Sequence, residues 1–280
     1  MTDTRARAAQ LTDTLPAGTV SDELAPVIDR LGLADNCRQL VDEGYTVIAG
    51  AAAPEVTARL REAILTASRI TSDADAGGAS MLLRRDPVFA EVVLNPKLMA
   101  MAEFSVGRGH LLSQVAGSVK PRGGAGLALH ADQNWFPAPF PEHNYMVTFC
   151  WTCDEYTREG GATLMIPGTH RLRRHPDHDE IAAADGAIAI ECPAGSVAVW
   201  DGSVWHGAWP RTTEGQRVVC HITYCRLAAR QVEDYGPWAD ELIGRHGEAM
   251  AQLLGRTDSL FKPTGFDYSR LVSTFNTAKR

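Results

Sequence analysis

The sequence of 280 residues predicts a mainly β protein, an antiparallel sandwich or barrel that helices precede and follow in the chain. After Gly109 come short β-rich runs, separated by glycine, proline and aspartate, with no helix between them. These runs are residues 110–119, 145–153, 162–166, 187–190, 196–200 and 217–226. Successive short strands without intervening helices favour an antiparallel sheet over a βαβ fold. Helical periodicity precedes this region and returns after it.

The part before the strands is predicted to be mainly helical. Residues 1–20 have no period and are expected to form a flexible tail. Ser21 is suited to cap a first helix, and a second short helix should stop at Gly44, because glycine accepts a left-handed conformation. Residues 45–48 are typical of a strand, and Pro54 opens another helix.

Further elements follow on either side of the strands. The glycine-rich residues 73–80 are typical of a loop, and helices are predicted over residues 87–93 and 96–104. A single late helix is predicted over residues 237–255, whereas residues 260–280 have no clear period.

Length and composition are those of an ordinary globular protein, with 45% hydrophobic and 22% charged residues. We expect a single domain, in which residues 21–108 support a core of residues 109–228 and residues 229–280 form a helix and tail. The net charge of −7 provides no basic field for nucleic acid. No apolar run approaches the roughly 20 residues that span a bilayer. The chain starts without an apolar signal segment, so a cytoplasmic location is expected.

The cysteines allow a second interpretation. Their number is six, and they are Cys37, Cys150, Cys153, Cys192, Cys220 and Cys225. The spacings of Cys150 with Cys153 and of Cys220 with Cys225 leave a zinc site as an alternative. Both pairs lie in strand-like runs, where residues three or five apart face opposite sides. Buried, reduced thiols are therefore the favoured interpretation.

The strongest site signal is His130-x-Asp132. In an extended segment alternate residues face the same side, so both side chains can reach one point. A distant histidine would complete a triad of two histidines and one carboxylate. That set binds ferrous iron and leaves coordination positions open for oxygen and an organic ligand.

Two histidines compete for the third position. His206 follows a predicted strand and a tight turn and is flanked by Trp205 and Trp209. His221 lies inside an apolar run, where a core histidine is an adequate account, so we favour His206. The sequence also holds a decoy, His175-Pro176-Asp177. Its proline removes a donor from any central strand, so a solvated loop is expected there.

These residues carry a resemblance to a known family. His130-x-Asp132, the segment 160–170, His206 and Arg217 resemble the pattern of the phytanoyl-CoA dioxygenase family, and the similarity covers roughly residues 38–228. The resemblance implies a double-stranded β-helix (jelly-roll) core. It implies an enzyme that uses Fe(II), 2-oxoglutarate and O2 and releases succinate and carbon dioxide. In that reaction His130, Asp132 and His206 would be the catalytic metal ligands.

The same resemblance assigns residues to the cosubstrate. It places at Arg217 the arginine that pairs with the far carboxylate of 2-oxoglutarate, and a planar guanidinium can hold a carboxylate by two parallel hydrogen bonds. Trp151 matches a family tryptophan beside the cosubstrate, with a core aromatic as the alternative. Gln114, on the strand before the triad, is a further candidate. Ala131 departs from members that carry glutamine there, whereas Asp132 argues against the halogenases, which have a small residue at that place.

The substrate is less clearly marked. Trp135, Phe136 and Trp205 are close in sequence to the metal-binding segments and are candidates to line an apolar pocket, or else they cap the core. The basic run Arg171–Arg174 could meet the phosphates of a coenzyme A thioester, but charged runs usually face water. We therefore expect a small, mainly apolar organic substrate, such as a secondary-metabolite intermediate.

Three alternatives stay open. The chain could be an acyl-CoA hydroxylase with the same chemistry, a β-barrel that binds a small ligand without catalysis, or a cupin-like zinc hydrolase. The complete triad together with Arg217 favours the oxygenase, since a binding module would not need all four residues. The oligomeric state is not indicated.

Overall fold

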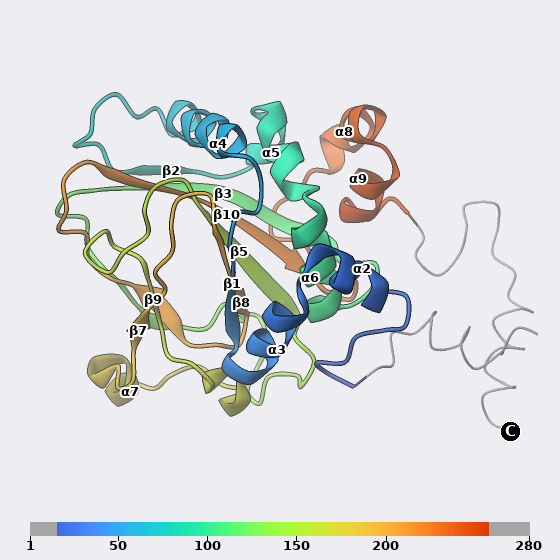
Figure 1. Ribbon diagram of the computed structural model, residues 1–280, viewed down its shortest axis with the longest axis horizontal. Helices are drawn as coiled ribbons and strands as arrows, with labels where there is room; N and C mark the ends of the chain where they lie inside the picture. Colours follow the sequence, from blue (N-terminus) through green and yellow to red (C-terminus); the bar gives the residue numbers. More distant parts are fainter. Residues whose placement is uncertain (1–15, 258–280) are drawn as a thin grey trace, which may run out of the picture.

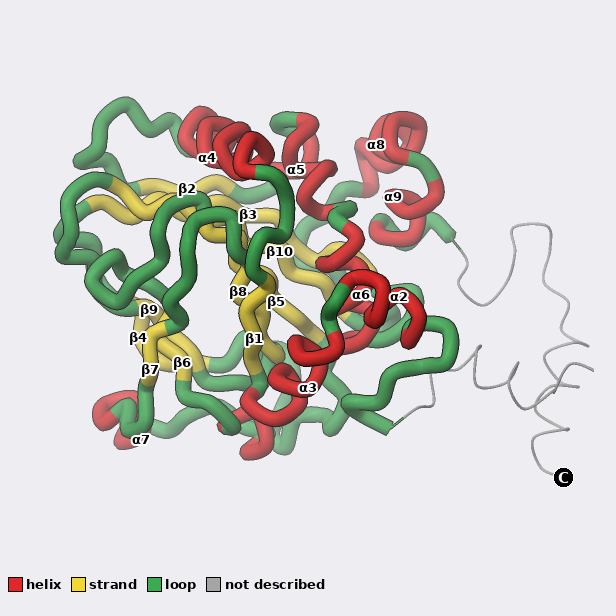
Figure 2. The backbone as a smooth tube through the Cα atoms, viewed as in Figure 1, coloured by secondary structure: helices red, strands yellow, loops and turns green. Residues whose placement is uncertain are grey.

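Two antiparallel sheets face each other in the computed structural model, which describes residues 16–257 (Figures 1 and 2). Within these residues the larger sheet has six strands in the order β1-β8-β5-β10-β3-β2, and the smaller has four in the order β4-β9-β6-β7. Strands from distant parts of the sequence are thus neighbours in both sheets, as in a jelly roll. The fold class predicted from the sequence is confirmed.

The centre of the larger sheet is buried on both faces. Its strands are β1 (Tyr45–Ile48), β2 (Gly77–Ala79), β3 (Leu111–Pro121), β5 (Met146–Thr152), β8 (Val197–Asp201) and β10 (Gln216–Cys225). The smaller sheet consists of β4 (Leu127–His130), β6 (Thr163–Met165), β7 (Ile188–Ala189) and β9 (His206–Ala208). Nearly every residue of β5 and β10 is buried. Their long apolar runs are therefore those of strands covered on both sides.

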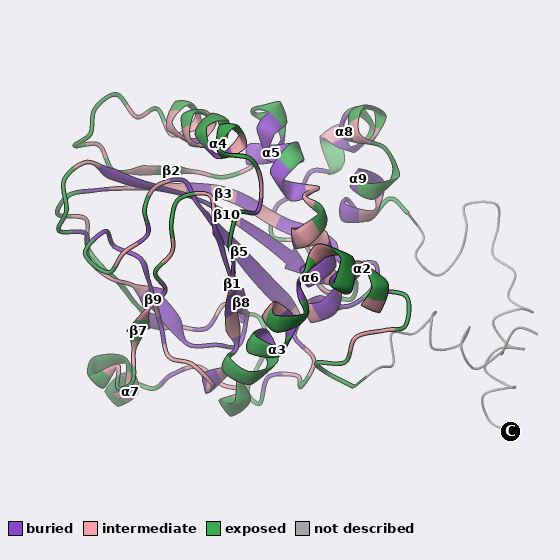
Figure 3. Cartoon of the chain, viewed as in Figure 1, coloured by how far each residue is buried: buried purple, intermediate pink, exposed green. Residues whose placement is uncertain are grey.

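Most of the helices cover the outer face of the larger sheet (Figures 1 and 3). The helices are α2 (Ala25–Leu31), α3 (Ala34–Glu43), α4 (Pro54–Ala67), α5 (Pro87–Val93), α6 (Pro96–Val106), α7 (His178–Ala183), α8 (Ala239–His246) and α9 (Glu248–Leu253). Except for α7, they pack their apolar residues in one cluster with outward-facing strand residues such as Val147, Phe149 and Trp151. Alternate residues of the same strands face the space between the sheets, where the site lies. No helix in residues 16–257 has the length and apolar character needed to cross a bilayer.

Helix boundaries follow local capping chemistry. The side chains of Asp86 and Asn95 each accept a hydrogen bond from the amide two residues later and are followed by proline, so α5 and α6 begin where the sequence predicts. Helix α3 ends at Gly44, which has a φ of 78°. Ser21 does not cap α2, which begins at Ala25. Its hydroxyl instead accepts a hydrogen bond of 3.1 Å from the Leu24 amide in the preceding turn.

Several elements differ from those predicted. Strand β2 lies within residues 73–80, which were predicted to be a loop, and it pairs with Gly117–Val119 of β3. Both β1 and β2 join the larger sheet, although they come from the part predicted as helical support. The late helix is divided into α8 and α9 at Gly247, whose φ of 74° a right-handed helix cannot contain.

His110 provides a test of the helix-facing core, because it is buried and packs edge-on against Tyr224 with ring centroids 5.4 Å apart. Burial lowers the pKa of His110 from 6.5 to about 4. The unfolded chain therefore binds a proton more readily between these values, and the free energy of unfolding should fall as the pH falls from 6.5 towards 4. We expect the free energy of unfolding of the His110→Phe variant to fall less at acid pH than that of the native protein, by as much as about 3 kcal/mol. Denaturant unfolding at pH 7 and pH 4.5 measures this difference. The control is His178→Asn, because His178 is exposed.

Candidate active site

Two histidines meet across the smaller sheet. His130, the last residue of β4, is directly paired with His206, the first residue of β9. Residues opposite each other in an antiparallel pair share a face, so both imidazoles point between the sheets. Their ring centroids are 4.3 Å apart. Strand pairing thus brings together two side chains that are 76 residues apart in the sequence (206 − 130).

The backbone orients both imidazoles. The Nδ1 atom of His130 lies 2.9 Å from the carbonyl oxygen of Ala128, and Nδ1 of His206 lies 3.1 Å from that of Val204. A carbonyl oxygen can only accept, so each Nδ1 donates the proton and each Nε2 is directed toward Asp132 as the atom that could bind a metal. Burial lowers the pKa of His206, although Asp132 opposes this shift. His206 is therefore a neutral imidazole, as a metal ligand must be.

Asp132 presents one carboxylate oxygen to the histidines. Its Oδ1 lies 3.8 Å from Nε2 of His130 and 3.5 Å from Nε2 of His206. The other oxygen, Oδ2, accepts hydrogen bonds of 3.0 Å from the Thr148 hydroxyl and from Nε1 of Trp200. Burial favours the protonated acid, but His206, Trp200, His130 and Thr148 together hold the pKa of Asp132 below its ordinary value. The site therefore has an ionised carboxylate with one oxygen already fixed.

These three side chains form the one group of histidine, cysteine or acidic residues in the described part of the chain that can hold a metal ion, with ligand atoms all within 4.8 Å of one another. The decoy motif, His175-Pro176-Asp177, does not form such a group. Asp177 caps α7 by accepting from the Glu180 amide, and His175 packs edge-on against Phe140. Two neutral imidazoles and one carboxylate on one side of a point are the donor set of a ferrous site with open positions.

Removing the hydrogen bonds to Asp132 should weaken metal binding. Trp200→Phe keeps the ring but loses the indole N–H, and Thr148→Val loses the hydroxyl. Removal of a side chain that hydrogen-bonds to a metal ligand commonly lowers metal affinity about 10–100-fold, and we expect a loss in that range for each variant. Competition for Fe(II) with a chelator measures it. Trp238→Phe, at a tryptophan that stacks under Arg84 on the far side of the core, should bind Fe(II) as the native protein does.

Arg217 lies deeper between the sheets and has no acidic partner. The residue is 4% exposed, and its guanidinium donates to the carbonyl of Gly161 (3.1 Å) and the hydroxyl of Ser118 (3.2 Å). Its Nε has no hydrogen-bond partner, and no carboxylate of residues 16–257 lies within ion-pairing distance. A buried charge without a partner costs several kcal/mol. Arg217 therefore calls for an anionic ligand.

Lys120 adds a second positive charge beside it. Lys120 on β3 is directly paired with Arg217 on β10, and like charges placed opposite each other are unfavourable. The Lys120 ammonium donates to the carbonyl of Trp209 at 3.1 Å, and burial together with the charge of Arg217 lowers the pKa of Lys120 to about 8. Two adjacent cations strengthen the case for an anion at this end of the site.

Inward-facing residues of β3 with accessible surface lie between the cations and the triad. Gln114, Ala116, Ser118 and Lys120 face inward at alternate positions of β3, and all four keep accessible surface, whereas the outward-facing residues between them are buried. Gln114 is paired with Thr223, which is paired with Thr148, the partner of Asp132. The guanidinium of Arg217 reaches the level of Ser118, four residues from Gln114. At about 3.4 Å per residue this distance along the strand is roughly 14 Å, which exceeds the length of a short dicarboxylate.

Trp151 does not face the space between the sheets. Its ring is fully buried among the helix-facing residues, and its Nε1 donates to the hydroxyl of Thr57 on α4 at 3.1 Å. On β5 the inward-facing positions are Thr148, Cys150 and Thr152, because side chains alternate. The contacts of Trp151 are thus those of the core aromatic that the sequence left as an alternative.

The aromatic candidates for the substrate pocket lie in different places. Trp205 is buried on the outer side of the smaller sheet, where its Nε1 donates to the carbonyl of Arg174. Phe136 packs against the same cluster and against Tyr145, with ring centroids 4.7 Å apart. Trp135 is 63% exposed on the loop after Asp132. Of the three, Trp135 is the one whose ring is free to meet a ligand.

The cysteine pairs do not form a zinc site. Cys150 belongs to the apolar cluster between the sheets, whereas Cys153 packs on the helix-facing side. All six cysteines are free, and burial raises the pKa of Cys150 to about 12, so its thiol is protonated. The expectation of buried, reduced thiols agrees with these positions.

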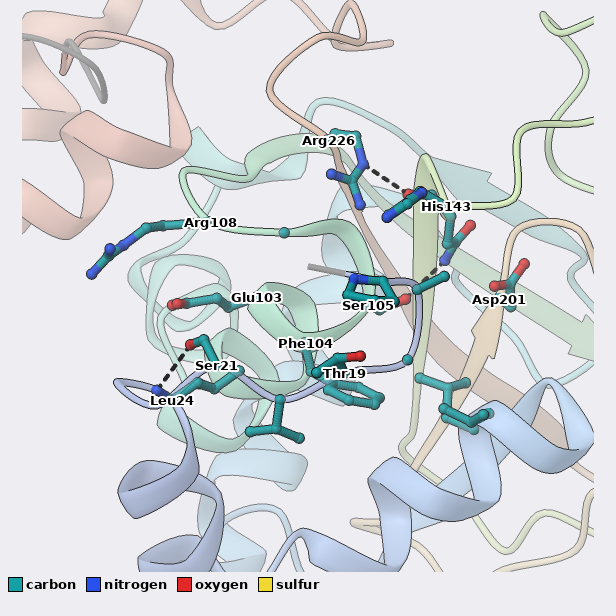
Figure 4. A pocket seen from close by; sticks show the side chains of 18 of the residues that line it. Thr19, Ser21, Leu24, Glu103, Phe104, Ser105, Arg108, His143, Asp201 and Arg226 are labelled. Carbon is teal, nitrogen blue, oxygen red and sulfur yellow. Dashed lines mark hydrogen bonds between the residues drawn. The ribbon is translucent and has the colours of Figure 1, made fainter. Parts of the chain in front are cut away.

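A separate cavity of about 420 Å³ lies under the segment 16–24, between α6 and the start of β5 (Figure 4). Glu103, Arg108, His143 and Arg226 line it, but none of the triad residues, Arg217 or Lys120 does. It is therefore distinct from the metal and cation sites between the sheets.

Several site residues were not predicted. Thr148 and Trp200 had no signal in the sequence, because they reach Asp132 from the opposite sheet. Ser118 and Lys120 could have been found, since they share with Gln114 the alternate positions of one strand.

Comparison with known proteins identifies relatives of this arrangement. The family model for phytanoyl-CoA dioxygenase (PhyH) matches residues 40–219, more than half of the chain. The uncharacterized protein Rv1501 of Mycobacterium tuberculosis is 27% identical over 205 residues, covering 70% of this chain and 74% of that protein. Dioxygenase af480 of Aspergillus fumigatus is 30% identical over 132 residues, covering 47% of this chain and 42% of that protein.

The fold is shared with a protein of known structure. EctD from S. alaskensis, solved with 2-oxoglutarate and 5-hydroxyectoine, superposes with a TM-score of 0.59 at 22% identity, covering 71% of this chain and 77% of that chain. Its structure with bound Fe gives a TM-score of 0.60 at 20% identity, covering 76% and 84%. At sequence identities this low, the structural similarity to EctD establishes a shared fold and no more.

Proposed function

This chain belongs to the phytanoyl-CoA dioxygenase family of Fe(II)- and 2-oxoglutarate-dependent oxygenases, and we propose that it oxidises a small, mainly apolar organic molecule. Hydroxylation of a secondary-metabolite intermediate, with release of succinate and carbon dioxide, is the proposed outcome. We also propose that the chain acts as one catalytic domain. The observation that carries the proposal is a three-ligand metal site together with a buried guanidinium, on a strand of the facing sheet, that has no acidic partner among the described residues.

The metal would be held by His130, Asp132 and His206. Two neutral imidazoles and one carboxylate leave a ferrous ion with a net positive charge and with open positions on one side. When bound, iron and 2-oxoglutarate activate O2 and supply the oxidising power, which the protein itself lacks. Thr148 and Trp200 keep one oxygen of Asp132 directed at the metal.

The cosubstrate would be anchored by Arg217. Its guanidinium is buried between the sheets without an acidic partner among the described residues, and a carboxylate beside it would neutralise a charge that the fold leaves uncompensated. Lys120 contributes a second positive charge beside that carboxylate, and Gln114 lies near the metal end of the same face.

A small, apolar substrate fits the surroundings better than an acyl-CoA. The basic run 171–174 is engaged within the protein: Arg171 donates to the Asp42 carbonyl, Arg173 to the Phe140 carbonyl, and Arg174 pairs with Glu180. These side chains are not free to bind phosphates. Trp135, beside Asp132, instead offers an exposed apolar ring. EctD, which shares this fold, was solved with 5-hydroxyectoine, and the size of this molecule supports a small substrate.

Coupled turnover tests the proposal. The chain is incubated with Fe(II), 2-oxoglutarate, O2 and a panel of small apolar compounds and, separately, acyl-CoA thioesters, and succinate and oxidised product are measured. We expect succinate in proportion to an oxidised apolar compound, and none when iron or 2-oxoglutarate is left out. Product from the thioesters alone would establish the acyl-CoA hydroxylase instead, and turnover with zinc and without O2 would establish a hydrolase.

A further inference from the structure

His221 lies on β10 between the triad and Arg217, in the row of inward-facing residues. It is directly paired with Ala116 on β3 and with Cys150 on β5. Four residues separate it from Arg217, so both side chains face inward from the same strand. Its ring lies 6.1 Å from Trp200, which itself packs against His206 at 5.0 Å. His221 therefore borders the path from the cations to the metal site.

The ring of His221 has no hydrogen-bond partner among the residues that the structure describes. Polar groups inside proteins are nearly always hydrogen-bonded, so a histidine that only fills the core would be expected to have such a partner. His221 also keeps accessible surface, although it lies on a central strand whose outer face the helices cover. Its direct partner on β3 is the small residue Ala116. His221 thus belongs to the same group of accessible inward-facing residues as Ala116 and Ser118.

We propose that His221 is a positioning residue for the cosubstrate, whose imidazole N–H donates a hydrogen bond to a carboxylate oxygen of 2-oxoglutarate. This inference rests on the proposed function. A carboxylate accepts several hydrogen bonds, so Arg217 and His221 can bind the same ligand without competing. Burial and the charge of Arg217 lower the pKa of His221 to about 4, so the ring is neutral and adds a donor without adding charge.

The test measures cosubstrate binding without turnover. The protein is loaded with Mn(II), 2-oxoglutarate is titrated by calorimetry, and the dissociation constant is compared between variants. We expect His221→Leu to raise this constant by about 10–100-fold, the effect of losing one hydrogen bond to a charged group. His221→Gln, which keeps a donor, should restore most of the affinity. Cys220→Ala, at the next residue but facing the helices, should bind as the native protein does.

The outcomes separate this inference from the proposed function. If the native protein binds 2-oxoglutarate and His221→Leu binds it equally well, the inference is wrong while the proposed function stands. If the native protein with metal does not bind 2-oxoglutarate, the proposed function is wrong as well. Should the leucine variant fail to fold, as judged by circular dichroism, His221→Ala takes its place under the same criteria.

Discussion

Replacing Asp132 by alanine is expected to abolish turnover and to weaken Fe(II) binding strongly. Asp132 provides the negatively charged ligand of the proposed site, and the two neutral imidazoles that remain cannot balance the charge of the ion. The loss should exceed the roughly 10–100-fold effect of removing a hydrogen-bonding partner of a ligand. The rate of succinate formation and the dissociation constant for Fe(II) measure the effect of the substitution.

The decoy motif provides a matched control for Asp132→Ala. Asp177 is also the aspartate of a His-x-Asp sequence, but it caps α7, so Asp177→Ala should cost about 1 kcal/mol of stability. It should leave Fe(II) binding unchanged. A folded Asp132→Ala protein that still binds Fe(II) and forms succinate at the native rate would show that the metal is held elsewhere.

Replacing Arg217 by alanine is expected to weaken 2-oxoglutarate binding by about 1.5–3 kcal/mol, the range for a hydrogen-bonded charged pair, which corresponds to about tenfold to more than a hundredfold. The guanidinium is buried, has an unpartnered Nε and has no acidic neighbour among the described residues, so the cosubstrate would be its counter-charge. Arg217→Lys keeps the charge but loses the planar fork, and it should have an intermediate affinity. Anaerobic equilibrium titration of the metal-loaded protein measures both.

Arg122→Ala is the control for Arg217, because Arg122 is an exposed arginine paired with Glu214 in the loop after β3. It should bind 2-oxoglutarate with native affinity. An unchanged dissociation constant in Arg217→Ala would remove Arg217 from the site and leave its buried charge without an explanation.

Local patterns allowed much of the fold to be predicted. The apolar runs of β5 and β10 and the Asp86 and Asn95 caps carry their own signals, so the strands and helices that depend on them were found. β2 was missed because two of its three residues are glycine, and it exists through its pairing with β3. Elements that depend on partners distant in the sequence leave little local trace.

The site shows the same division. His130 and Asp132 were recognised because alternate residues of a strand share a face, and the structure brings them to His206. Trp205 was set beside them as a substrate residue because it is adjacent to His206, yet adjacent residues of a strand face opposite ways, and its ring lies on the outer side of the smaller sheet. His221 was set aside as a core residue. Only the pairing of β10 with β3 and β5 places it on the open inner face.

Anaerobic addition of Fe(II) and then 2-oxoglutarate to the native protein tests most directly whether residues 130, 132 and 206 hold one metal with open positions beside Arg217. We predict a weak visible metal-to-ligand band that saturates at about one equivalent of each, because a chelating keto acid needs two free positions on the metal. A folded, iron-loaded protein without this band would contradict the account.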